Sequence, residues 1–113
     1  MKVKEKGHTL IITSNEETLQ EFIEKLSQQY ESSFKKSNLV IDLTTATFQM
    51  NEVEIEQFAT IAIPHMEEVN KSFVLVIEGI DFNEYDEDLV VVPTLQEALD
   101  LIEMDEIQRD LGF

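Results

Sequence analysis

The stretch Leu39-Val40-Ile41-Asp42-Leu43 decides the fold, because it is continuously apolar except for Asp42. A run of this kind is typical of a strand covered on both faces, which lies in the middle of a sheet with helices above and below it. Residues 44–50 follow this strand, and a helix is predicted to open near Asn51. The sequence therefore predicts an α/β domain built around this strand.

Two short strands are predicted before the central one, over residues 3–6 and 9–13. Gly7 lies between them, and glycine accepts the positive backbone torsion that a tight turn needs. The two strands are therefore expected to form an antiparallel hairpin at the N-terminal end of the domain.

An amphipathic helix is predicted between the hairpin and the central strand, running to about Ser33. Ser14 or Asn15 is suited to cap it, and Glu16 and Glu17 suit the positive end of its dipole. Its apolar stripe consists of Leu19, Phe22, Ile23, Leu26 and Tyr30.

A second amphipathic helix is predicted after the central strand. Its apolar positions are Val53, Ile55, Phe58, Ala59, Ala62 and Met66. Pro64 interrupts the pattern, and a proline inside a helix costs about 3 kcal/mol. A kink or a break is therefore expected between Ile61 and Pro64.

The remainder of the chain predicts two more strands and a last helix. The strands are expected over 72–78 and 89–92, with an acidic loop over 79–88 between them. Thr94 and Glu97 stand in the capping-box relation at the helix start. That helix places Leu95, Ala98, Leu99 and Ile102 on one face; residues 104–111 either continue it or form a short second helix, and Gly112 suits a left-handed C-terminal cap.

The predicted order is thus ββαβαββα, in one domain that spans residues 1–113. Strands that alternate with helices imply crossover connections. The fold class expected from this order is α/β, with a mixed, mostly parallel sheet of four to five strands and helices packed against it.

Composition narrows the classes of function. The formal net charge is −16, and such a surface repels phosphate, so no nucleic-acid partner is expected. The chain has no cysteine, which fits a reducing compartment, and no apolar run approaches the thickness of a bilayer. We therefore predict a cytoplasmic protein that does not bind a membrane, whose acidic surface either keeps it soluble or meets a basic protein partner.

The residues that could carry chemistry are few. His8 lies in a predicted turn and His65 follows Pro64, so both are interpreted as surface or capping residues rather than as catalytic bases. Their spacing fits no zinc motif, and residues 81–92 lack the glycine and the final glutamate of a calcium-binding loop. No catalytic residue, metal or cofactor is predicted.

The segment Asp42-Leu43-Thr44-Thr45-Ala46-Thr47-Phe48 resembles the strand and loop of STAS domains, the anti-anti-sigma-factor fold, whose usual run is D-L-S-G-V-x-F. The segment from Val91 to Leu99 is similar to the last strand and helix of that family, where T/S-L-x-E-A-L is common. The resemblance covers nearly the whole chain in element order and implies a STAS-like fold.

The resemblance also points to a partner surface. In STAS regulators, a partner kinase phosphorylates a serine at the start of this helix, and phosphorylation releases the partner. Met50-Asn51-Glu52-Val53 stands at that place, without a hydroxyl group. Asn51 suits a helix cap. A sharper hypothesis is that Glu52 makes this surface permanently negative, like a fixed phosphorylated state. The predicted partner-binding residues are Asn51, Glu52, Ile55, Thr47 and Phe48.

Residues 1–7 and 105–113 resemble a small family of bacterial STAS-like proteins that are encoded beside ribonuclease Z, some of which carry that enzyme's label. The nuclease needs a histidine-rich two-zinc site, which this chain lacks. The sequence thus predicts a non-catalytic interaction module whose partner is a kinase-like or sigma-regulatory protein. The alternatives are an accessory role to ribonuclease Z or RNA processing, and a small-ligand module with an apolar cleft between Ile61, Met66 and the last helix.

Overall fold

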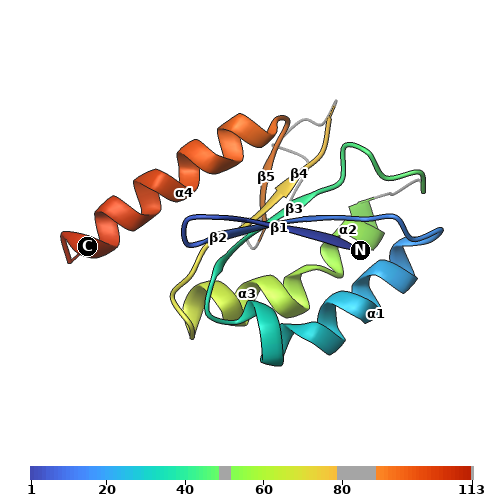
Figure 1. The fold of residues 1–113 in the computed structure, drawn as a ribbon, viewed down its shortest axis with the longest axis horizontal. Coiled ribbons are helices and arrows are strands. Elements are labelled where there is room, and N and C mark those ends of the chain that lie inside the picture. Colours follow the sequence, from blue (N-terminus) through green and yellow to red (C-terminus); the bar gives the residue numbers. More distant parts are fainter. Residues whose placement is uncertain (49–51, 79–88, 113) are drawn as a thin grey trace.

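The computed structural model describes residues 1–48, 52–78 and 89–112, with residue 52 described in its backbone alone. Its sheet has the strand order β1-β2-β3-β4-β5, with β1 antiparallel to β2 and every other neighbouring pair parallel (Figure 1). The strands are β1 (Lys2–Lys6), β2 (Thr9–Thr13), β3 (Asn38–Asp42), β4 (Phe73–Val76) and β5 (Val90–Val92). The predicted α/β class and the mixed, mostly parallel sheet are confirmed.

The helices lie on both faces of this sheet. They are α1 (Leu19–Gln29), the π-helical turn η1 (Tyr30–Phe34), α2 (Glu52–Glu56), α3 (Ala59–Glu67) and α4 (Leu95–Asp110). Figure 1 shows α1, α2 and α3 on one side of the sheet and α4 on the other. The strand order explains this division. α1 joins β2 to β3 and α3 joins β3 to β4, and right-handed crossovers between parallel strands that follow one another in one direction place both helices on the same face. α4 comes after the last strand and is not part of such a crossover. Among the described residues, every helix is too short or too polar to cross a bilayer.

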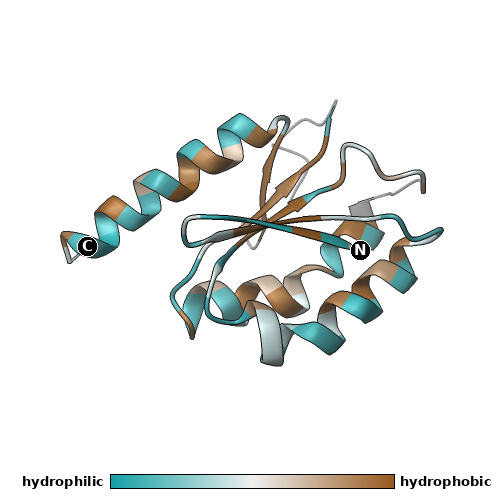
Figure 2. Cartoon of the chain, in the orientation of Figure 1, coloured by the Kyte–Doolittle hydropathy of each residue, from teal (hydrophilic) through white to brown (hydrophobic). Residues whose placement is uncertain are grey.

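The core has two layers, one on each face of the sheet. Successive side chains of a strand point to opposite faces, so Leu39 and Ile41 pack toward α1 and α3, whereas Val40 packs toward α4. All three are fully buried, as a strand covered on both sides requires. Figure 2 shows the continuous hydrophobic colour of the central strands. The central position predicted for this strand is confirmed.

The first helix begins later than predicted. Thr18 is its N-cap and accepts a hydrogen bond from the Glu21 amide at 3.2 Å. Ser14 is not free to cap a helix, because its hydroxyl group donates to Glu16 Oε1 at 3.0 Å and accepts from the Glu16 amide at 3.2 Å. The prediction of Ser14 or Asn15 as the cap was wrong.

The break in the second helical segment also differs from the prediction. It falls at residues 57 and 58, between α2 and α3, while Pro64 lies inside α3. The Phe58 amide bonds the carbonyl of Ile55 at 3.1 Å, a three-residue turn that ends α2. This turn sends both side chains into the core. Pro64 is tolerated because it removes only the hydrogen bond to the carbonyl of Thr60, an exposed residue.

The last helix begins and ends as predicted. Thr94 Oγ1 accepts a hydrogen bond from the Glu97 amide at 3.2 Å, and Gly112 has a φ of +81°. Between them, α4 continues unbroken to Asp110. Ala98 and Ile102 are buried on the predicted face. The turn at Gly7, with a φ of +61°, is confirmed as well.

Candidate functional site

The loop after β3 lies where the parallel strands end, the edge of an α/β sheet at which binding sites are usually found. Asp42 Oδ1 accepts two hydrogen bonds from Thr44, one from the amide at 3.0 Å and one from the hydroxyl group at 2.6 Å. The Leu43 amide donates to the carbonyl of Val76 at 2.9 Å. These bonds fix the start of the loop to the sheet edge. Beyond them, Thr47 is exposed and Phe48 is half-buried against the core.

The first turn of α2 separates two apolar residues that the helical spacing had placed together. Ile55 is 2% exposed and belongs to the core, whereas Val53 is 73% exposed. Ile55, a predicted partner-binding residue, is therefore a packing residue in this structure. Val53 was predicted to face the core, and the structure places it on the surface. No sequence signal distinguishes the two, because both fit the apolar pattern of one short helix.

In the structure Thr47 is thus exposed and Phe48 is half-buried, in the stretch of chain that precedes α2. Asn51, the predicted cap, lies outside the described residues, as does the side chain of Glu52. The acidic segment 79–88 is likewise outside them. The described part of the candidate site is therefore the loop after β3 together with Val53.

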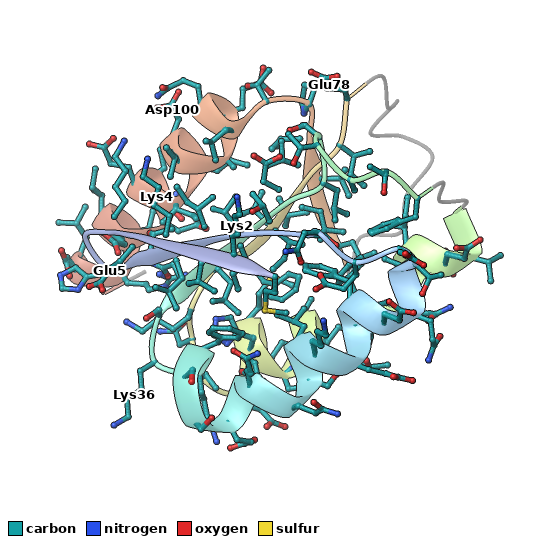
Figure 3. All side chains as sticks on the ribbon, turned by 45° about the vertical axis from the view of Figure 1, so that its right-hand side comes forward. Lys2, Lys4, Glu5, Lys36, Glu78 and Asp100 are labelled. Atoms are coloured by element: carbon teal, nitrogen blue, oxygen red, sulfur yellow. The ribbon has the colours of Figure 1, made fainter. Side chains whose placement is uncertain are left out.

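A groove of about 390 Å³ opens beside Asp42, on the face of the sheet that carries α4. The register of β1 with β2 pairs Lys4 with Ile11, which packs on the α4 side. Figure 3 shows Lys2 and Lys4 projecting from β1 on that side. The lining residues are Lys2, Val3, Lys4, Ile11, Thr13, Asp42 and Leu95. Positive side chains thus stand close to the candidate site in an acidic protein.

The predicted cleft between Ile61, Met66 and the last helix does not form. Ile61 is a residue of α3 that packs in the core layer between the helices and the sheet, and α4 lies on the opposite face of the sheet. Met66 does share a pocket of about 250 Å³ with Gln108 and Arg109 of α4, but polar residues such as Ser72 also line it. The sheet therefore separates Ile61 from α4, whereas Met66 reaches α4 in a pocket that polar residues also line.

His65 is buried, which corrects its interpretation as a surface or capping residue. Its Nε2 lies 2.8 Å from the carbonyl of Ser37 and its Nδ1 lies 2.6 Å from the hydroxyl group of Tyr30. A carbonyl only accepts, so Nε2 carries the proton and Nδ1 accepts from the tyrosine. Burial lowers the pKa of His65 below its usual 6.5. The neutral ring joins α3 to η1 and to the start of β3, which is a structural role.

The pKa of Glu16 is shifted further than that of His65. Burial raises its pKa, but hydrogen bonds from the amino group of Met1, from Lys25 and from Ser14 outweigh burial and lower the pKa from 4.5 to about 2. The distances to Glu16 Oε2 are 2.7 Å from the amino group and 3.1 Å from Lys25 Nζ. Glu16 therefore fixes the start of the chain against α1.

A metal centre finds no support in this part of the chain. Within residues 1–48, 52–78 and 89–112, no three histidine, cysteine, aspartate or glutamate side chains gather closely enough to hold an ion. His8 is exposed at the hairpin turn, and His65 is occupied by its two hydrogen bonds.

Comparison with known proteins does not assign the chain to a family. No protein-family model matches the sequence, and no curated protein is detectably similar to it. The resemblance to STAS domains therefore stays a prediction from the motifs around Asp42 and Thr94.

Proposed function

We propose that this chain is a non-catalytic protein-interaction module of the STAS type, which contacts its partner through the loop after β3 and the first turn of α2. The observation that carries the proposal is the 73% exposure of Val53 beside Glu52 and the exposed Thr47. Binding would remove this apolar side chain from water, which is the main driving force of protein association. The two hydrogen bonds from Thr44 to Asp42 would hold the start of the loop in place for this contact.

Glu52 would give this surface a fixed negative charge. By its resemblance to STAS regulators, the segment Met50-Asn51-Glu52-Val53 would replace the turn with the serine whose phosphorylation controls partner binding, so the chain would behave as a module with a constant binding state. A kinase-like or sigma-regulatory protein is the partner that this resemblance implies, and the cytoplasm is the compartment. A carboxylate near a helix start is also favoured by the helix dipole.

The test is a photo-crosslinking experiment in cells, with the photoreactive residue placed at position 47. Val53→Ser and Glu52→Ala should each weaken the crosslink to the specific partner, because they remove the apolar and the charged part of the surface. Val3→Ser is the matched control, since Val3 is an exposed valine of β1 that lies on the groove beside Asp42 and outside both the loop after β3 and α2. Circular dichroism should show that all three variants fold.

The identity of the crosslinked protein separates the alternatives. A kinase-like or sigma-regulatory protein supports the switch-derived module, and ribonuclease Z supports the accessory role. A crosslink that survives Val53→Ser and Glu52→Ala, or that Val3→Ser weakens equally, would overturn the proposed surface. Metal-dependent RNA cleavage by the pure protein would overturn the non-catalytic assignment.

A further inference from the structure

The last turns of α4 present apolar side chains to solvent. Met104, Ile107 and Leu111 are 58%, 52% and 66% exposed. Their spacing of three and four residues places them in one row along the helix. Earlier in the same helix, Ala98 and Ile102 are buried against the sheet. At about 100° per residue, the apolar row therefore changes to the opposite side of the helix between Ile102 and Met104.

Polar contacts hold the sheet-facing side of these turns. Arg109 donates from Nη2 to Ser72 Oγ at 2.8 Å and from Nη1 to Asn38 Oδ1 at 3.3 Å. Asn38 Nδ2 donates to Glu106 Oε1 at 2.7 Å, and Ser72 Oγ donates to Asp105 Oδ2 at 2.8 Å. Asn38 and Ser72 are buried. The second half of α4, from Glu103 to Asp110, is thus fixed to the starts of β3 and β4. Its apolar row makes no contribution to these contacts.

The surroundings of this row are acidic. Asp100, Glu103 and Asp110 are exposed and lie within one helical turn of it. Figure 3 shows Asp100 projecting from α4 away from the sheet. Arg109 is the only basic residue of α4, and its guanidinium group is engaged on the sheet side. A ligand of this row therefore meets an apolar centre with a negative border.

We propose that the row Met104-Ile107-Leu111 is a docking surface for a basic amphipathic helix of a partner protein. Leucine or isoleucine at helical spacing would cover the row, and flanking lysine or arginine would meet its acidic border. A second copy of this chain is disfavoured, because each copy carries a net charge of −16 and the same acidic border. Anionic lipid is disfavoured for the same reason.

This surface is distinct from the loop after β3, because α2 and α4 lie on opposite faces of the sheet (Figure 1). The inference therefore goes beyond the proposed function and does not depend on it. Either surface can fail in experiment while the other stands. A fixed helix is well suited to this task, since a preorganised surface loses little conformational entropy on binding.

The test uses the full chain and a synthetic helical peptide of about 18 residues, with leucines at helical spacing and lysines on the flanks. Nuclear magnetic resonance should place the peptide-induced shift changes on the second half of α4. Met104→Gln with Ile107→Gln should weaken the affinity about tenfold or more, since removing apolar anchors has effects of this size. Both changes leave the charge unaltered.

Two controls make the test specific. Val53→Gln alters an apolar residue that is more exposed than any of the row and lies on the other side of the molecule, and it should leave peptide affinity within about twofold. A peptide of equal charge with serines in place of leucines should bind far more weakly. If circular dichroism shows that the double variant is misfolded, Leu111→Gln alone replaces it.

Three results would overturn the proposal. The first is peptide affinity that is unchanged in the double variant or reduced equally by Val53→Gln. The second is a dimer of the free protein, seen by analytical ultracentrifugation and abolished by the double variant, which would identify a second copy as the occupant. The third is binding to anionic phosphatidylserine vesicles that depends on the same three residues.

Discussion

The two halves of α4 turn opposite kinds of side chain toward the sheet. The first half packs Ala98 and Ile102 against the sheet, as an amphipathic helix ordinarily does. The second half turns polar side chains to the sheet, among them Arg109, and apolar ones to solvent, among them Ile107. The comparison shows that one unbroken helix can be held by apolar burial at one end and by buried hydrogen bonds at the other.

Ile102→Ala should have the largest effect on the free energy of unfolding. It removes a buried side chain and leaves a cavity, so the free energy of unfolding should fall by about 2–4 kcal/mol. The matched change Ile107→Ala alters the same residue type in the exposed half and should stay within about 0.5 kcal/mol of the parent. Urea unfolding measures both. Equal losses would show that the two halves do not differ in packing.

The next effect should come from Asn38→Ala. This change leaves the buried Ser72 amide without its acceptor at 3.0 Å and removes the donor to Glu106. The free energy of unfolding should fall by about 1–3 kcal/mol. Hydrogen exchange should quicken in the second half of α4 and not in the first. Gln108→Ala, an exposed change on the same helix, is the control, and a uniform response along α4 would contradict the polar anchoring.

Thr94→Ala should cost about 1 kcal/mol, because it removes the hydrogen bond that caps the first half. The effect on hydrogen exchange should be the reverse of the previous one, with quicker exchange near Thr94 and little change near Arg109. Thr18→Ala makes the same substitution at the cap of α1 and should leave α4 untouched. A loss of protection along the whole of α4 would argue that its halves are not independent.

The smallest effect, near pH 6, should come from His65. Its folded pKa lies below its ordinary value of 6.5, so it stabilises the fold above pH 6.5 and this contribution is lost as the pH falls through the folded pKa. The change should loosen α3 before α4, because the ring contacts Tyr30 and Ser37. Exchange measured from pH 8 to 5, the upper limit set well above the ordinary pKa of histidine, tests this. His65→Gln should remove the pH dependence of the protection of α3 against exchange. If that dependence persists in the variant, another titrating group causes it.

Much of the fold was predictable because the strongest patterns had one meaning. The run from Leu39 to Leu43 had to be a covered strand, and Thr94 with Gly112 bounded the last helix correctly. The second half of α4 was not predictable, since Met104 and Ile107 have the spacing of a core face. Only the position of the sheet shows that this face points outward.

The candidate site was harder to predict for a similar reason. Val53 and Ile55 are two residues apart in a short helix, and the sequence alone does not show which of them the preceding loop turns toward the core. The burial of His65 could not be predicted from the sequence either, because its partners Tyr30 and Ser37 are far away in the chain. Long-range contacts, and not local patterns, decided these positions.

The lysines of β1 have a consequence for how copies of this protein behave in concentrated solution. β1 is an edge strand whose five residues are all exposed, and such an edge invites pairing with a second molecule. Antiparallel pairing of two copies would set even-numbered residues opposite even-numbered ones, and so lysine against lysine. Like charges directly opposite each other are destabilising. The hairpin therefore carries its own protection against pairing of two copies through β1.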